Sequence, residues 1–373
     1  MADGDRQTLD ARQSEYEALA STHGGYWRHG FVDHAYLYNL YFPPQLLVQQ
    51  LRNSFDELLL NYPVAQDELA ALVGDLIGQP ASHVVVGNGA AELIKIISGG
   101  LAKRLIVPVP SFNEYANAAA EGTVIEFPLD STSFHLDVDS FAAAAIDGGA
   151  DIAVVVTPNN PTSLTVPRAD LLRLSRKLEP HGCTLIVDES FIDFTETPAS
   201  ESVERDVHDH KNLAVIKSMS KAYGICGLRI GYLLTADPAL ASRVRDGLHI
   251  WNINGIAEEF LRVAPAFRQD FVESCAKVRA DRDAFYEALC GIDGMRVFRP
   301  TANFVFCRLP AQSASGVEIE RRLFVEHNIY IKHCGGKTMD DGDRYVRIAS
   351  RTQAENEALV SALSEVLEAG EHR

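Results

Sequence analysis

Seven short apolar runs lie between residues 83 and 234, and helix-like stretches separate several of them. The runs cover residues 83–86, 104–109, 123–127, 151–156, 183–187, 213–216 and 229–234. Continuous apolar strands that alternate with helices, such as 90–97 and 168–178, are typical of a mainly parallel sheet covered on both faces. We therefore predict one large α/β domain over residues 46–255.

The segments on either side of this domain follow other patterns. Residues 1–45 show no strong helical period but are rich in aromatic side chains, which predicts an arm that packs across the body or onto a second subunit. After a long helical region at 256–289, strand-like runs at 303–309, 329–333 and 344–349 alternate with helices at 316–327 and 354–367. We predict a smaller α+β domain over residues 256–373.

Composition narrows the partners and the compartment. The 373 residues carry a net charge of −17, which argues against a nucleic-acid partner because such proteins concentrate positive charge. The N-terminus lacks the apolar core of a signal peptide, and no run approaches the roughly 18 apolar residues of a membrane span. The six cysteines form no C-x-x-C pair, which is typical of a reduced, cytoplasmic protein. Residues 195–210 are predicted to form a polar loop that contains His208 and His210. These two histidines could bind a metal, but a solvated loop is the favoured interpretation, and no metal is predicted.

The stretch 218–232, SMSKAYGICGLRIGY, places Lys221 between Ser218 and Ser220 and leads through a glycine-punctuated turn to Arg229. A nearby cation and the exclusion of water both lower the pKa of a lysine, which lets its amine attack a carbonyl. Hydroxyls, backbone N–H groups and a guanidinium are the donors that a phosphate monoester prefers. The stretch predicts pyridoxal phosphate held by Lys221 as a Schiff base, with a surface lysine on a loop as the alternative.

Four further sites follow predicted strands, at the edge where parallel α/β sheets bind ligands. Residues 87–92 open a helix and could bind an anion, and Asn160 lies in a proline-stiffened turn where its amide could donate to a phenolate oxygen. Asp188 ends an apolar run, where it could pair with a protonated pyridine nitrogen, and the ring of Phe112 could stack on the cofactor. Each site has an ordinary structural alternative. Their combination with Lys221 at one edge favours the cofactor.

The motifs GNGAAELI, TPNNPT, VDESFIDF and SMSKAYGICGLRIGY, in this order, resemble the fold-type I pyridoxal-phosphate enzymes of the aminotransferase class I/II superfamily. The closest likeness is to the branch that holds histidinol-phosphate aminotransferase and threonine-phosphate decarboxylase. HGGYWRHGF, LYNLYFPP, IWNINGIAEEF, TANFVFCRL and YVRIASRTQAEN also look like the decarboxylase/aminotransferase half of bifunctional nucleotidyltransferase proteins. The resemblance covers the chain from His23 onward, and we expect no nucleotidyltransferase part in it.

The resemblance implies the fold and the roles of individual residues. The fold would be a mainly parallel seven-stranded sheet with a smaller α+β C-terminal domain. Lys221 would be the Schiff-base lysine and proton carrier, Asp188 the pyridinium partner and Asn160 the donor to the phenolic oxygen, with Phe112 stacked on the ring. The phosphate would be held by Ala90, Ala91, Ser218, Ser220 and Arg229, with Tyr62 reaching it from the other subunit of a homodimer. Arg347 would bind the substrate carboxylate, and Asn39 and Tyr41 would lie near the substrate.

Two departures from the family pattern bear on the reaction. Phe191 stands where the family usually has a tyrosine whose hydroxyl also holds the phenolic oxygen, which leaves Asn160 alone in that role. Tyr41 and Phe42 alter the asparagine-rich N-terminal motif of the histidinol-phosphate enzymes, which argues against histidinol phosphate as the substrate.

The sequence leaves the reaction open between two outcomes at the α-carbon. The bond held perpendicular to the cofactor ring is the one that breaks, so anchoring of the substrate decides between aminotransfer and α-decarboxylation. We expect an L-amino acid that bears a phosphate, phosphonate or nucleotide group, whose distal anion could be bound by a cation. The candidates are Arg28, Lys332, Arg347 and Arg351. β- or γ-elimination and C–C bond formation are a smaller alternative, and a non-catalytic binding module is disfavoured because Lys221 and Asp188 are both present.

Overall fold

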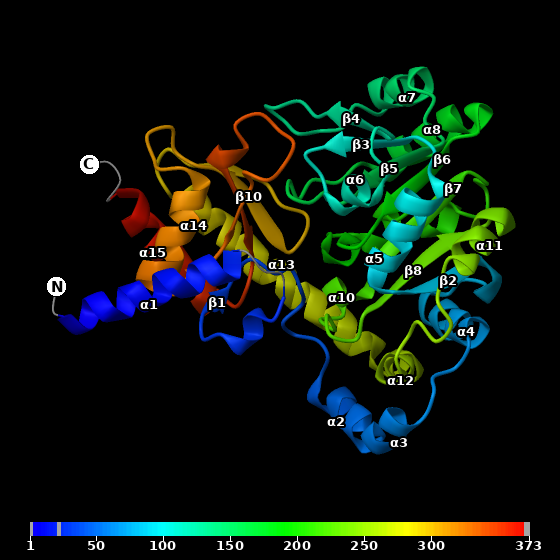
Figure 1. Cartoon of the computed structure of the whole chain (residues 1–373), viewed down its shortest axis with the longest axis horizontal. Helices are drawn as coiled ribbons and strands as arrows, with labels where there is room; N and C mark the ends of the chain where they lie inside the picture. The colour runs from blue at the N-terminus through cyan, green and yellow to red at the C-terminus, as the bar shows by residue number, and fades with distance from the viewer. Residues whose placement is uncertain (1–2, 21–23, 369–373) are drawn as a thin grey trace. The chain divides into compact units, whose positions relative to one another are not determined.

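The computed structural model describes residues 3–20 and 24–368, which form two compact units. Unit 1 contains the described residues of Met1–Leu37, Pro161–Ser163 and Val278–Arg373, and unit 2 contains Tyr38–Asn160 and Leu164–Lys277. Figure 1 labels their helices and strands.

Unit 2 is built on a seven-stranded sheet in the order β2-β8-β7-β6-β5-β3-β4. Its strands are β2 (Val84–Asn88), β3 (Leu105–Val109), β4 (Val124–Pro128), β5 (Ile152–Val156), β6 (Thr184–Asp188), β7 (Leu213–Ser218) and β8 (Ile230–Thr235). The pairs from β7 through β4 are parallel, whereas β8 runs antiparallel to both of its neighbours. All seven predicted strands are present, and the prediction of a mainly parallel sheet is confirmed.

Helices cover both faces of this sheet because its strands bury alternate residues on opposite sides (Figure 1). Val155, Val187 and Val215 belong to one apolar cluster, and Val154, Ile186 and Ile216 belong to the other. The helices of unit 2 are α2 (Gln45–Asn53), α3 (Phe55–Leu60), α4 (Gln66–Ile77), α5 (Gly89–Ile94), α6 (Glu114–Ala118), α7 (Val138–Asp147), α8 (Arg168–Leu178), α9 (Pro198–Glu201), α10 (Met219–Ala222), α11 (Pro238–Asp246) and α12 (Gly255–Val263).

Unit 1 holds a four-stranded antiparallel sheet in the order β12-β13-β10-β9. Its strands are β9 (Arg296–Phe298), β10 (Phe304–Arg308), β12 (Lys332–His333) and β13 (Tyr345–Ala349), and β1 (Val32–Asp33) pairs in parallel with β11 (Ile329–Tyr330). The predicted strand at 329–333 is thus divided into β11 and β12, and β9 was not predicted. Helices α14 (Gly316–His327) and α15 (Gln353–Glu368) lie close to their predicted positions.

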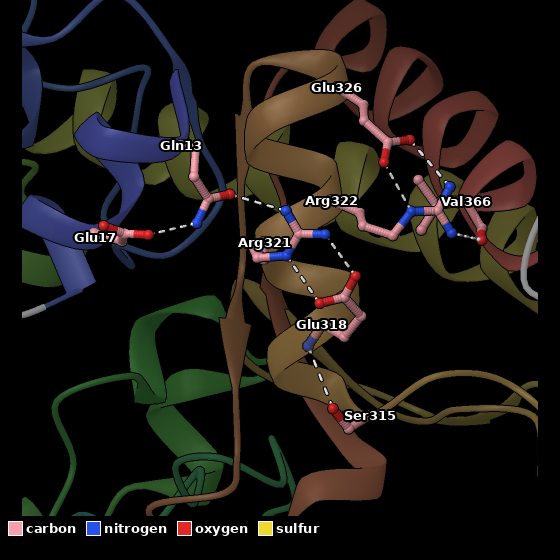
Figure 2. Close-up of polar contacts among 8 residues, drawn as sticks. All are labelled: Gln13, Glu17, Ser315, Glu318, Arg321, Arg322, Glu326 and Val366. Atoms are coloured by element: carbon pink, nitrogen blue, oxygen red, sulfur yellow. Dashed lines mark hydrogen bonds and ion pairs between the residues drawn. The ribbon is translucent and has the colours of Figure 1, made fainter. Parts of the chain in front are cut away.

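The N-terminal segment differs from the expected arm because it opens with an 18-residue helix, α1 (Asp3–Ala20). This helix packs on α14 within unit 1, where the rings of Tyr16 and Phe324 lie 5.8 Å apart. Figure 2 shows a polar link between the same helices, in which Nη1 of Arg321 donates to Gln13 at 2.8 Å. From residue 9 to the end of α1, only Tyr16 and Leu19 are buried. The apolar face of this helix is therefore too narrow to give a clear helical period in the sequence.

The boundary between the units also differs from the predicted one. It falls between Lys277 and Val278, inside α13 (Arg268–Cys290), and not between residues 255 and 256. The reason is that α12 packs against α2, α3 and α4, with Phe260 and Leu261 fully buried, and therefore belongs to unit 2. The expected helix at 256–289 is interrupted by a 3-10 turn at Ala264–Phe267, where Pro265 cannot continue the α-helical hydrogen bonds.

None of the helices within residues 3–20 and 24–368 combines the length and the hydropathy needed to cross a lipid bilayer.

Candidate active site

Asp188 ends β6 and is nearly completely buried, with 3% of its surface exposed. The hydroxyl of Tyr115 donates to its Oδ2 at 2.9 Å, and the backbone N–H of Ser190 donates to its Oδ1 at 3.0 Å. Burial raises the pKa of Asp188, whereas the bonds from Ser190 and Tyr115 and the charge of Lys221 oppose that rise. A carboxylate in this environment gains from a cationic partner, and a protonated ring nitrogen would be one.

Lys221 lies on the four-residue helix α10, directly after β7. Asn39 fixes this turn from another part of the chain: its backbone N–H donates to the carbonyl of Lys221 and its side-chain amide donates to the carbonyl of Ala222, both at 2.9 Å. At the end of β7, the N–H of Ser218 donates to Oγ of Ser190, two residues after Asp188, at 3.0 Å. Backbone hydrogen bonds therefore hold the lysine-bearing turn and the end of β6 together at one edge of the sheet.

Arg229 and the start of α5 form a narrow cradle beside this edge. The carbonyl of Arg229 accepts a hydrogen bond from the N–H of Gly89 at 2.9 Å, and its Nη1 lies 3.4 Å from Oγ of Ser220. A Cβ on Gly89, whose φ is +70°, would lie 2.4 Å from Nη2 of Arg229. A Cβ on Gly231 would come equally close to the backbone nitrogen of Ala90. Only glycine permits these approaches, and the donors that gather here suit a phosphate.

The other expected cofactor contacts follow β3 and β5. Asn160 is buried, and the preceding turn is joined to β6 because the N–H of Thr157 donates to the carbonyl of Asp188 at 2.9 Å. Phe112 is half-buried, with its ring 6.5 Å from that of Tyr115 and nearly perpendicular to it. Ala90 is buried and Ala91 exposed at the start of α5, and Ser218 and Ser220 are buried. The structure thus gathers these residues in unit 2, while their individual contacts with a cofactor stay predictions.

Sequence reasoning missed Tyr115, whose buried hydroxyl is a direct partner of Asp188. Its position was the available signal, because Tyr115 comes three residues after Phe112 and lies on the short helix that follows β3. Phe191, which stands in place of the usual tyrosine, is buried with 4% of its surface exposed.

Sequence reasoning also missed a buried charged network that begins one residue after Asp188. Glu189 is fully buried and accepts hydrogen bonds from Oγ of Ser202 at 2.6 Å and from the N–H of Val203 at 2.7 Å. Burial and the nearby Glu204 raise the pKa of Glu189 to about 8. Lys217, whose charge acts on Glu189, forms an ion pair with Asp193 at 3.1 Å. Burial alone would lower the pKa of Lys217, but the surrounding carboxylates raise it overall.

The candidate substrate residues of unit 1 have distinct environments. Arg347 lies opposite Lys332 across β13 and β12, and its Nη2 donates to the carbonyl of Ala35 at 2.5 Å. Burial lowers the pKa of Arg347, so this guanidinium would gain from an arriving carboxylate. Arg351 is bound to the carbonyl of Asp33 and to Glu355, which favours a structural role. The fourth candidate, Arg28, lies over the ring of Trp27.

The remaining predicted residues lie in unit 2. The amide of Asn39 also donates to Oγ of Ser274 at 2.8 Å, and its Oδ1 accepts from the N–H of Tyr41, so Asn39 holds the chain in place and contact with the substrate stays a prediction. Tyr62 is 78% exposed and stacks on Trp251 with 4.2 Å between the ring centroids.

The expected polar loop at 195–210 contains α9 and buries Val203 and Val207. His208 lies beside Gln79, with 3.0 Å between its Nε2 and Oε1 of that residue. Within residues 3–20 and 24–368, no group of three or more His, Cys, Asp or Glu side chains could hold a metal ion.

Comparison with known proteins places this geometry in context. The sequence model of the family described as aminotransferase class I and II matches residues 39–363. A CMP-5'-(3-aminopropyl)phosphonate synthase of Streptomyces rubellomurinus is 44% identical over 368 residues, which cover 98% of this chain and 58% of the synthase. A threonine-phosphate decarboxylase of Salmonella typhimurium is 32% identical over 77% of this chain and 78% of that enzyme. The crystal structure of the histidinol-phosphate aminotransferase from Clostridium acetobutylicum has a TM-score of 0.82 at 27% identity and covers 91% of this chain and 99% of that one.

These findings confirm the resemblance inferred from the motifs, and the fold class with it. They also confirm pyridoxal phosphate as the cofactor of the matching family. The chain spans less than two thirds of the length of the phosphonate synthase.

Proposed function

Because the chain belongs to the aminotransferase class I and II family, we propose that it removes the α-carboxyl group of an L-amino acid that bears a phosphate, phosphonate or nucleotide group. The observation that carries the proposed cofactor chemistry is the buried pair of Asp188 and Tyr115 at the sheet edge that also holds Lys221, and the choice of decarboxylation rests on the similarity to the phosphonate synthase. Pyridoxal phosphate, when bound there, supplies an electron sink for the electron pair that is left at the α-carbon.

Residues of unit 2 would bind and orient the cofactor. The carboxylate of Asp188 would keep the ring nitrogen protonated, and the hydroxyl of Tyr115 would hold that carboxylate in position. Asn160 would donate to the phenolic oxygen, and Phe112 would lie against the ring. The donors for the phosphate would be Arg229, the hydroxyls of Ser218 and Ser220, and the N–H groups of Ala90 and Ala91.

Lys221 would hold the cofactor through its Nζ and would then carry a proton to the α-carbon. Its turn is fixed by the hydrogen bonds from Asn39, so the amine is presented from a rigid support. If Arg347 were to bind the α-carboxylate, loss of the α-proton and aminotransfer would follow. If the cations of unit 1 were to bind the distal anion instead, the α-carboxylate would be left without a cation and CO2 would be lost.

Decarboxylation is preferred because of the named product of the 44% identical relative. The words 3-aminopropyl describe an amine without a carboxyl group on its carbon chain. Among other relatives, L-serine phosphate decarboxylases are 29% and 30% identical to this chain. Aminotransfer is the second candidate, and the likeness to the histidinol-phosphate aminotransferase of Clostridium acetobutylicum supports it.

Product analysis with the cofactor-loaded protein tests the proposal. We would supply O-phospho-L-serine, L-2-amino-4-phosphonobutyrate and the CMP conjugate of the latter, joined through a P–O–P anhydride, and measure CO2, amine and keto acid. Release of CO2 with one equivalent of amine, after a proton replaces the carboxyl group, is the expected result. Keto acid without CO2 would establish aminotransfer instead, and no product from any of the three would refute the proposed substrate class.

We further propose a homodimer, because unit 2 exposes large apolar side chains around Tyr62 and Trp251. The group also includes Leu46, Phe55, Leu59, Leu60 and Ile250. An exposed apolar surface of this kind is typical of a protein interface, and a second copy of the chain is the proposed occupant. Leu60→Asp should convert the dimer to a monomer in analytical ultracentrifugation, whereas Val272→Asp, at another exposed position, should not. A wild-type monomer with full activity would refute this proposal.

The six cysteines, four of them buried and none in a C-x-x-C pair, support a reducing, cytoplasmic location.

A further inference from the structure

We propose that Trp27 and Arg28 form a platform that binds the nucleoside part of a nucleotide-bearing substrate. The inference rests on the proposed function, since it specifies which of the expected distal groups the enzyme selects. It concerns only unit 1, where both residues lie on the 3-10 turn Tyr26–Arg28.

The pair combines a flat ring with a cation. The Trp27 side chain is 81% exposed, and the guanidinium carbon of Arg28 lies 4.7 Å from the centroid of its ring. Bases stack on exposed aromatic rings, and a guanidinium beside the ring can bind a phosphate oxygen through its remaining N–H groups. The net charge of −17 means that an anionic ligand depends on local cations such as Arg28.

Ring packing and a backbone hydrogen bond fix the 3-10 turn that carries Trp27 and Arg28. Tyr26 is buried, and its ring stacks on Tyr36 at 4.6 Å and meets the edge of Tyr330 at 5.4 Å. The N–H of Arg28 donates to the carbonyl of Gly25 at 3.0 Å, and Gly25 has a φ of +76°, which a residue with a side chain rarely adopts. The backbone below the exposed ring is therefore already ordered, which reduces the entropy lost on binding.

The same contacts connect the platform to Arg347, one of the candidate cations for the distal anion. Tyr36, which stacks on Tyr26, follows Ala35, whose carbonyl accepts the hydrogen bond from Arg347. The N–H groups of Ala35 and Tyr36 both donate to Oδ1 of Asp33, which fixes this corner. A substrate whose phosphonate is near Arg347 would thus extend over an aromatic surface toward Trp27. This arrangement suits a long amino acid that ends in a nucleotide.

Two further observations suit the phosphorus groups between the two ends of such a substrate. Lys332 lies directly opposite Arg347 in the sheet, and its Nζ is 5.9 Å from the ring centroid of Tyr330. Like charges placed opposite each other are unfavourable unless an anion is near both. The buried carboxylate of Glu320 lowers this repulsion on one side, and the anionic phosphorus groups of the substrate would lower it further on the other.

Substrate preference is the first test. The specificity constant, kcat/KM, is measured with the CMP conjugate of L-2-amino-4-phosphonobutyrate and with the free phosphonate, for the wild type, Trp27→Ala and Arg28→Gln. Trp27→Ala should lower kcat/KM for the CMP conjugate roughly 5- to 150-fold, through KM, and leave the free phosphonate unchanged, because stacking of one base is lost. Arg28→Gln should have a smaller effect with the same preference.

The chain offers a matched control in the same unit. Arg296 lies over the ring of Phe298 at the same 4.7 Å, so Arg296→Ala removes an equivalent cation–π contact away from the platform. It should leave both substrates unaffected. Equal effects of Trp27→Ala on both substrates, or no effect on either, would overturn the inference while leaving the proposed function intact.

Binding of CMP to the cofactor-loaded protein, measured by calorimetry, separates this inference from the proposed function. CMP should bind the wild type and Arg296→Ala and bind Trp27→Ala much more weakly. This result would support the platform even if none of the amino acids were converted. No binding of CMP to the wild type, or a Trp27→Ala variant that changes only the sedimentation of the protein, would overturn it.

Discussion

Two regions of the molecule are ordered by different kinds of contact. One is the proposed cofactor edge of unit 2, the edge of the sheet where Asp188, Lys221 and Arg229 lie. The other is the aromatic corner of unit 1, which comprises Tyr26–Tyr36 and Tyr330. At the cofactor edge, backbone and side-chain hydrogen bonds link strand ends, as from Thr157 to Asp188 and from Ser218 to Ser190. In the aromatic corner, stacked and edge-on rings fix the turns, and the guanidinium of Arg28 lies over the exposed ring of Trp27.

This difference separates the chemistry that the family shares from the chemistry that selects a substrate. Hydrogen bonds between strand ends depend on the register of the whole sheet, so the cofactor edge tolerates little change. Ring packing tolerates exchange of one side chain for another of similar volume, so the aromatic corner can change its ligand without changing the fold. Variants at the cofactor edge should therefore affect every substrate, whereas variants in the corner should affect particular ones.

The largest expected effect is that of Lys221→Ala. Under the proposed function Lys221 holds the cofactor and carries the proton, so its loss should reduce kcat with every substrate by roughly 10⁴-fold or more. It should also abolish the visible absorbance of the bound cofactor. Lys211→Ala removes an exposed lysine and serves as the control. Full turnover by Lys221→Ala would refute the proposal that the cofactor is held at this edge of the sheet.

Asp188→Asn should come next. If Asp188 pairs with the ring nitrogen as proposed, this change removes a charge-assisted hydrogen bond of about 1.5–3 kcal/mol, which corresponds to a loss of roughly 10- to 150-fold in kcat. The loss should again be the same for all substrates. A wild-type rate in Asp188→Asn would show that the carboxylate has only a structural role.

Tyr115→Phe tests the support of Asp188 and should lower kcat only several-fold, within about 1.5 kcal/mol. Its distinctive result is in the pH profile. The hydrogen bond from Tyr115 lowers the pKa of Asp188, so its removal should raise that pKa and move the acid limb of the activity to higher pH. An unchanged acid limb would contradict this role for Tyr115.

The strands, and the placement of Asp188 and Asn160 at strand ends, were predictable from the sequence because both depend on local pattern. Continuous apolar runs mark buried parallel strands; Asp188 ends one such run and Asn160 lies in the turn after another. The closeness of Tyr115 to Phe112 in the sequence was a signal for its place beside the site, but its bond to Asp188 was not predictable, because 73 residues separate them and only the order of strands in the sheet brings them together. The unit boundary was missed for a similar reason, since the apolar face of α12 does not reveal which helices cover it.

Glu189→Gln should change how the stability of the protein depends on pH. The pKa of Glu189 is about 8 in the folded protein, well above the 4.5 of an ordinary glutamate, so the folded state holds its proton more tightly. The stability from this group is therefore complete below about pH 4.5 and is lost as the pH rises through about 8. Glutamine resembles the protonated form of this side chain. Between pH 6 and 9, the melting temperature of the variant should therefore fall by roughly 2–4 °C less than that of the wild type.

Glu121→Gln, at an exposed position, is the control for this comparison and should follow the wild type at every pH. Parallel melting curves for Glu189→Gln and the wild type across the range would show that the carboxyl group does not titrate there.

The smallest effect is expected at the polar contact between α1 and α14 within unit 1. In Figure 2, Arg321 on α14 donates to Gln13 on α1 and pairs with Glu318, while its neighbour Arg322 pairs with Glu326 and donates to the carbonyl of Val366 at 2.7 Å. The side chain of Arg321 is 33% exposed and that of Arg322 only 16%. Arg321→Gln should therefore lower the free energy of unfolding by less than about 1 kcal/mol, and Arg322→Gln by slightly more, because it leaves a less exposed carbonyl without its donor. Urea unfolding measures both. A larger loss from Arg321→Gln would mean that α1 depends on this polar link more than on the packing of Tyr16 against Phe324.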